Sequence, residues 1–128
     1  VYLFINRRIF WSAFFSAILS RVIFTEIIRY LLPRSRPFVA LENVKQLIEK
    51  NSSEQSFPSG HAAILFSIAF SVYLFNKKMG AILMTAALIF TFARVYAGVH
   101  YPGDIFGGIV VAGVAVYLVE RLSRRLRQ

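Results

Sequence analysis

Four long apolar stretches restrict what this chain can fold into more than any other feature. They run from Ile9 to Leu32, from Ala62 to Phe75, from Met79 to Ala93 and from Ile105 to Val119. The first is long enough for a helix that crosses a bilayer, which needs roughly 20 residues, and the others are shorter. Helices of a soluble bundle would carry a polar stripe, yet the second stretch has only two serines and a tyrosine hydroxyl. The pattern therefore predicts about four membrane-spanning helices with polar residues at their outer ends.

The composition also favours a bilayer as the solvent. Hydrophobic residues make up 57% of the 128 residues and charged residues only 16%, whereas an average soluble domain is about 45–50% apolar and about 25% charged. One core of this length cannot bury so much apolar surface. The apolar content excludes a disordered basic tail and argues against a nucleic-acid partner, despite the net charge of +9. We expect an all-α membrane helical bundle forming a single domain, residues 1–128.

The basic residues predict how these helices cross the membrane. If the first helix runs outward, eight of the fifteen basic residues share one side with both termini, opposed there by Glu120 alone. By the positive-inside rule this side is cytoplasmic. The Arg34–Pro58 loop and the Arg94–Asp104 region then face the outside or periplasm. The eight residues are Arg7, Arg8, Lys77, Lys78, Arg121, Arg124, Arg125 and Arg127.

The outer loop has its own pattern. Leu41, Val44, Leu47 and Ile48 recur at helical spacing among charged residues, which predicts a short amphipathic helix lying at the interface.

Ionisable residues in or beside the spans are candidates for function, because a charge placed there is costly. They form three groups that the expected topology brings to one depth at the outer side. The only two histidines of the chain belong to this cluster. The groups are Arg29 with Arg36-Pro37, then Pro58-Ser59-Gly60-His61, then Arg94 with His100 and Asp104.

The first expectation for this cluster is an anion site. Three arginines in a partly dehydrated setting suit a multiply charged anion, and guanidinium groups match phosphate oxygens bidentately. Ser59 stands where a helix N-cap is expected, and Gly60 permits close approach of the backbone. The free N–H groups of that helix start would add a second set of anion donors.

The histidines suggest the chemistry. His100 and Asp104 are four residues apart and would share a face if helical. A carboxylate on one ring nitrogen makes the other a better nucleophile or base, and His61 remains as a general acid. Together these residues suggest phosphoryl transfer through a phosphohistidine. Two histidines and an aspartate could instead bind a metal, but the arginines would repel a cation, so we expect no metal and no cofactor.

Arg21 and Glu26 interrupt the first apolar stretch without belonging to these groups. They are five residues apart, a spacing at which an α-helix aligns a direct ion pair poorly. Their role does not follow from the sequence.

At these residues the chain resembles the type 2 phosphatidic acid phosphatases (PAP2), whose signature is K-x6-R-P, P-S-G-H and S-R-x5-H-x3-D. The chain has Arg29-x6-Arg36-Pro37, Pro58-Ser59-Gly60-His61 and Ala93-Arg94-x5-His100-x3-Asp104. The resemblance implies a membrane-embedded, metal-independent lipid phosphatase with a PAP2/haloperoxidase-like core. It assigns His100 as nucleophile, Asp104 as its orienting carboxylate and His61 as the leaving-group acid. It assigns phosphate binding to Arg29, Arg36, Ser59, Gly60 and Arg94.

Two residues and the length depart from the family pattern. Arg29 replaces the usual lysine, and Ala93 replaces a serine and so removes one possible phosphate contact. Integral members usually have six helices, with the first motif at the end of the third. Only one helix precedes that motif here, which leaves open a fragment lacking two N-terminal helices or a reduced four-helix form.

The resemblance extends to small bacterial members that look like undecaprenyl diphosphate phosphatases, which act at the outer face of the plasma membrane in cell-wall recycling. The expected substrate is a lipid phosphate within the bilayer, foremost undecaprenyl diphosphate. Phosphatidic acid or phosphatidylglycerophosphate would suit the same site chemistry, and a non-catalytic lipid-binding homologue is the alternative outside enzymes. The sequence does not predict an oligomeric state.

Overall fold

The computed structural model describes residues 2–128, with side chains from Arg7 onward, and this part of the chain is helical without strands. A long first helix is built from α1 (Tyr2–Ile18), a π-helical turn η1 (Leu19–Phe24) and α2 (Thr25–Leu31). A short α3 (Pro37–Ala40) follows, and then come α4 (Gly60–Phe75), α5 (Lys77–Tyr96) and α6 (Pro102–Arg125). The all-α prediction is confirmed.

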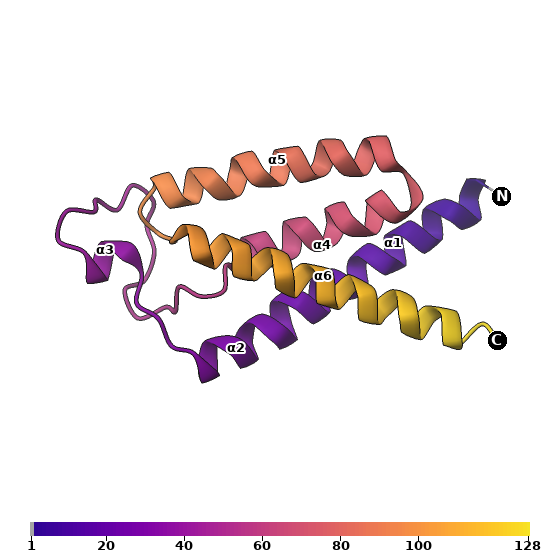
Figure 1. Ribbon diagram of the computed structural model, residues 1–128, viewed down its shortest axis with the longest axis horizontal. Helices are drawn as coiled ribbons and strands as arrows, with labels where there is room; N and C mark the ends of the chain where they lie inside the picture. Colours follow the sequence, from indigo (N-terminus) through magenta and orange to yellow (C-terminus); the bar gives the residue numbers. More distant parts are fainter. Residues whose placement is uncertain (1) are drawn as a thin grey trace.

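Three helical segments are long and apolar enough to cross a membrane: Arg7–Leu31, Lys77–Tyr96 and Pro102–Arg125. The fourth expected span, α4, is an apolar helix of 16 residues and is shorter than the other three. It lies inside the bundle in contact with α1, α5 and α6 (Figure 1). Since protein surrounds α4 on these sides, its ends need not reach the lipid head groups.

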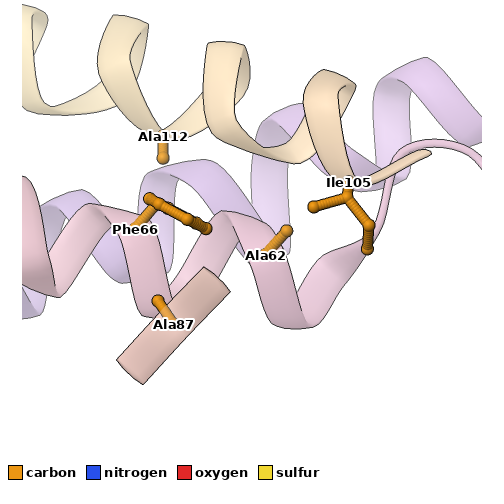
Figure 2. Packing of buried hydrophobic residues seen from close by; sticks show 5 residues of the cluster. All are labelled: Ala62, Phe66, Ala87, Ile105 and Ala112. Atoms are coloured by element: carbon orange, nitrogen blue, oxygen red, sulfur yellow. The ribbon is translucent and has the colours of Figure 1, made fainter. Parts of the chain in front are cut away.

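Small residues let α4 and α6 approach closely. Ala62 and Phe66 of α4 form a cluster with Ala87 of α5 and with Ile105 and Ala112 of α6 (Figure 2). Gly108 lies at the same contact, where an added Cβ atom would come within 2.6 Å of the Ala62 Cβ. Close backbone contact through alanine and glycine is typical of helices that pack in lipid, where van der Waals packing drives association.

Large apolar side chains cover the outside of the bundle. Phe10, Trp11, Phe14 and Phe15 of α1 are all exposed, and similar residues are exposed on α2, α5 and α6. Such a surface would aggregate in water, but lipid tails solvate it. The composition and this surface together describe a membrane protein.

The amphipathic helix expected around Leu41–Ile48 is not there, so this prediction was wrong. Residues 41–59 contain no helix. The N–H of Leu47 donates to the carbonyl of Ala97 at 3.1 Å, and the N–H of Phe38 donates to the carbonyl of Gly98 at 3.2 Å. The N–H of Leu47 thus bonds to the α5–α6 connection in place of a helical partner, and Phe38 of the preceding α3 bonds to the same connection.

The two ends of the bundle carry different parts of the sequence. Both termini and the α4–α5 turn lie at one end (Figure 1), which places the basic groups of the termini and of Lys77 and Lys78 together. The end of α2, the α3 segment, the start of α4 and the α5–α6 connection lie at the other end (Figure 1). All three motif groups belong to this second end.

Candidate active site

A cavity of about 270 Å³ opens among the motif segments at this end of the bundle. Its walls come from the first helix, the long loop after α2, the start of α4 and the α5–α6 connection. Most of the lining side chains are basic. The lining residues are Arg21, Arg29, Arg36, Lys50, Glu54, Gly60, His61 and His100.

The start of α6 brings Asp104 to His100. The sequence suggested a shared helix face, but His100 lies ahead of the helix and α6 begins at Pro102. Asp104 turns back at the third helical position, where its Oδ2 accepts the N–H of Tyr101 at 2.8 Å and lies 3.3 Å from Nδ1 of His100. His100 and Asp104 thus meet through the capping turn of α6, and not by sharing one face of a helix as expected.

The surroundings of His100 select one tautomer. Its Nδ1 faces the Asp104 carboxylate, which accepts, so this nitrogen carries the proton. Its Nε2 lies 3.5 Å from Nη1 of Arg36, which can only donate. The lone pair on Nε2 therefore points toward the Arg36 guanidinium, and His100 is one of the residues that line the cavity.

The protonation of His100 follows from its burial. The side chain is 2% exposed, and this burial is the largest influence that lowers the pKa of His100 below its ordinary value of 6.5. The hydrogen bond to Asp104 raises the pKa, while the charges of Arg36 and Arg94 lower it further. The net effect favours the neutral imidazole at neutral pH.

Two further residues hold Asp104, and neither was predicted from the sequence. Ser56 donates its hydroxyl to Asp104 Oδ2, and Arg34 Nη1 lies 3.3 Å from Oδ1. The guanidinium of Arg34 also covers the ring of Tyr101 at 4.1 Å. The Asp104 carboxylate is fully buried, so each of these donors compensates its desolvation. Their position in a long loop gave no periodic signal by which to find them.

Arg36 is held in place beside His100 by two further contacts. It is 1% exposed, its Nη1 donates to the carbonyl of Val99 at 2.9 Å, and its Nη2 donates to Glu54 at 3.0 Å. Burial lowers the pKa of Arg36, and Glu54 offsets this only in part. A bound anion would supply the missing compensation.

Ser59 begins α4, as expected for an N-cap. Its Oγ accepts the N–H of Ala62 at 3.4 Å, and its N–H donates to the Asp104 carbonyl at 2.9 Å. The side chain is fully buried and does not line the cavity. His61, on the next turn, is exposed and does line it. The contacts of Ser59 thus join the histidine-bearing helix start to the buried aspartate.

Arg29 and Arg94 have buried N–H groups without protein partners in the described part of the chain. These are Nε of Arg29, and Nε and Nη2 of Arg94. Arg29 lines the cavity and donates to the Pro58 carbonyl at 3.3 Å, whereas Arg94 lies outside its lining. Buried donors without an acceptor are costly, so these arginines suit an anion with several oxygens. Ala93 is exposed beside Arg94 and does not line the cavity either.

Arg21 lines the same cavity, although the sequence left it unexplained. Its Nη1 lies 2.5 Å from Oε1 of Glu26, and Nη1 of Arg29 lies 3.4 Å from the same oxygen. The expectation that Arg21 and Glu26 would align poorly was wrong, because the π-helical turn η1 between them widens the helix. A π-helix pairs residues five apart, and Thr25 Oγ1 accordingly donates to the Ser20 carbonyl at 2.8 Å.

The donor set of the site does not suit a metal ion. Among the described residues, no three His, Asp or Glu side chains gather as metal ligands. The cavity instead collects guanidinium and ammonium groups, which bind phosphate or carboxylate oxygens.

Comparison with known proteins identifies the family of the chain. The profile of the PAP2 superfamily matches residues 10–128. The chain belongs to the PAP2 superfamily. It is 36% identical over 105 residues to undecaprenyl-diphosphatase BcrC of Bacillus subtilis, covering 79% of this chain and 53% of that protein. It is 38% identical over 84 residues to the bacitracin transport permease protein BcrC of Bacillus licheniformis, covering 66% and 41%.

A solved structure shows that the fold of this PAP2 chain is shared. The crystal structure of LpxE from Aquifex aeolicus superposes with a TM-score of 0.75 at 27% identity, over 86% of this chain and 66% of that one. The chain spans about half the length of the curated relatives it matches.

Proposed function

We propose that this PAP2 chain is the phosphatase domain of a membrane enzyme that removes the terminal phosphate from a lipid diphosphate. The favoured substrate is undecaprenyl diphosphate, which would yield undecaprenyl phosphate. One observation carries the proposal: His100, with an unprotonated Nε2 and with Asp104 at its other ring nitrogen, lines a cavity together with three arginines. A histidine nucleophile and cationic donors for phosphate oxygens are what phosphoryl transfer needs.

The reaction runs in two steps. Nε2 of His100 attacks the terminal phosphorus, the bond to the bridging oxygen breaks, and the electron pair leaves with the lipid phosphate. His61, protonated at the start of the cycle, gives its proton to the departing oxygen. Water then attacks the phosphohistidine, His61 takes a proton from that water, and inorganic phosphate leaves as the P–N bond returns its electrons to His100.

The arginines stabilise charge during both steps. Arg36 lies next to Nε2 of His100, and Arg29 lies in α2. Both bind the equatorial oxygens of the transferred phosphoryl group. Arg94 lies outside the cavity lining and adds its positive charge and its unpartnered N–H groups. Ser59 and Gly60 contribute the start of α4, whose free N–H groups favour an anion.

The names of relatives and the charge of the cavity support this choice of substrate. A relative from Bacillus subtilis carries the name undecaprenyl-diphosphatase. Phosphatidic acid or phosphatidylglycerophosphate would present a similar phosphate to the same arginines. The basic termini support a site at the outer face of the plasma membrane, because basic segments favour the cytoplasmic side.

The test is phosphate release by the purified full chain in detergent from undecaprenyl diphosphate, phosphatidate and phosphatidylglycerophosphate. We expect the diphosphate to give the highest kcat/KM and EDTA to leave turnover unchanged. A preference for a glycerolipid would replace the substrate assignment. Release from none of them would leave only the lipid-binding alternative and reject the enzyme.

The covalent step has its own test. Brief exposure to diphosphate labelled in its terminal phosphate, followed by alkaline denaturation, should leave label on the protein. His100→Ala should carry no label, while the exposed loop control Ser53→Ala should keep it. Label retained by His100→Ala would remove the nucleophile assignment.

A further inference from the structure

Arg21 is a cation of the cavity that lies outside all three motif groups. It belongs to η1, and the wide π-helical turn allows its side chain to reach Glu26 five residues on. In a regular α-helix the two would be misaligned. Turns of this kind inside α-helices are frequent at functional sites.

The guanidinium of Arg21 lies against the start of α4. A Cβ atom added to Gly60 would come within 2.6 Å of Nε of Arg21, so the Arg21 side chain packs directly against the backbone at this position. Gly60 directly precedes His61. Arg21 therefore reaches the cavity on the same side as the leaving-group acid of the proposed reaction.

Glu26 holds Arg21 and Arg29 together at the cavity edge. One oxygen, Oε1, contacts both guanidinium groups, and Glu26 is itself exposed and outside the cavity lining. The lining thus contains four cations, Arg21, Arg29, Arg36 and Lys50, against the carboxylate of Glu54. These cations outnumber the carboxylate, so the cavity suits an anion that carries several negative charges.

We propose that Arg21 forms a subsite for the second, lipid-linked phosphate of a diphosphate and thereby selects diphosphates over monophosphates. The inference rests on the proposed phosphatase function. In phosphoryl transfer the leaving group departs opposite the nucleophile. With His100 attacking the terminal phosphorus, the lipid-linked phosphate lies toward His61 and Arg21. A monophosphate has only an alkyl oxygen at this place, which gives Arg21 no anion to bind.

The test uses two substrates that share one lipid tail, farnesyl diphosphate and farnesyl phosphate, with the purified full chain in detergent. In Arg21→Gln, the ratio of kcat/KM for the diphosphate to that for the monophosphate should fall roughly ten- to one-hundred-fold, the range of a lost hydrogen bond to a charged group. Arg21→Lys keeps the charge and should restore part of this ratio. The monophosphate turnover of the same samples reports their folding.

The matched control is Arg7→Gln, an exposed arginine at the other end of the same helix, which should keep the wild-type ratio. An unchanged ratio in Arg21→Gln would overturn the subsite, as would losses of equal size toward both substrates in Arg21→Gln and Arg21→Lys. If the wild-type chain hydrolysed neither compound, the proposed function would be overturned, and the subsite with it.

Discussion

Asp104 is the residue on which the geometry of the cavity depends most. Its carboxylate contacts His100, the Tyr101 N–H, Ser56 and Arg34, while its own carbonyl accepts the N–H of Ser59. Fully buried acids need such compensation. Asp104 therefore sets the tautomer of His100 through its side chain and holds the start of the helix that carries His61 through its backbone carbonyl.

The first prediction concerns the titration of His100. In His61→Gln it is the only histidine of the chain, so its imidazole signal in NMR is unambiguous. Burial lowers the pKa of His100, and we expect its titration midpoint below 6.5. Because the folded chain then binds this proton less readily than the unfolded chain, the contribution of His100 to stability is complete above pH 6.5 and declines as the pH falls below it. A midpoint above 6.5 would contradict the environment described for His100.

The second prediction concerns Ser56 as a positioning residue. Ser56→Ala removes one donor from a buried carboxylate, at about 1.5–3 kcal/mol for a hydrogen bond to a charged group. We expect kcat to fall about ten-fold or more, with a smaller change in KM, and the titration midpoint of His100 to shift. Ser53→Ala, in the exposed part of the same loop, is the control. A change in KM alone would show that Ser56 acts on binding and not through Asp104.

At the scale of helices, α1 and α6 are joined by a polar contact far from the cavity. Glu120 of α6 is 7% exposed. It accepts from Ser12 Oγ at 2.7 Å and from Arg8 Nη2 at 3.1 Å. Buried polar contacts between helices in lipid compensate groups that would otherwise lack a partner.

The third prediction is that Glu120→Ala destabilises the bundle by about 1–3 kcal/mol, because it leaves the Ser12 and Arg8 donors unpaired. Thermal unfolding in detergent should show a lower Tm, with Glu42→Ala, an exposed loop residue, as the matched control. An unchanged Tm would mean that lipid or detergent supplies equivalent partners.

The two ends of the bundle carry different groups of residues. Basic residues near the termini and in the α4–α5 turn lie at one end, and the segments that line the cavity lie at the other (Figure 1).

The fourth prediction uses the absence of cysteine from the chain. Ser52→Cys should react with a membrane-impermeant maleimide on intact cells, and Ser123→Cys only after the membrane is opened, because basic segments stay in the cytoplasm. The opposite labelling would place the cavity in the cytoplasm.

Local features of the sequence predicted most of the helices and the clustering of the motifs. Apolar length and composition indicated the spans, and Ser59 marked the start of α4, because N-capping depends on neighbouring residues alone. The distribution of basic residues predicted that the termini and the Lys77–Lys78 turn lie at one end and the three motif groups at the other. The spacing of His100 and Asp104 predicted their contact. It predicted a shared helical face, however, whereas the structure forms the contact through a capping turn.

Tertiary structure alone decided the remaining features. The Leu41–Ile48 pattern gave no helix, because its backbone bonds to the α5–α6 connection. Ser56 and Arg34 reach Asp104 across the fold, at separations that no local pattern encodes. The wide turn η1 made Arg21 a lining residue of the cavity. The sequence by itself determined the solvent, the helices and the residue types of the site, since these depend on local hydrophobicity and spacing. Only the packed bundle decided which side chains share the cavity, because that depends on contacts between residues distant in the chain.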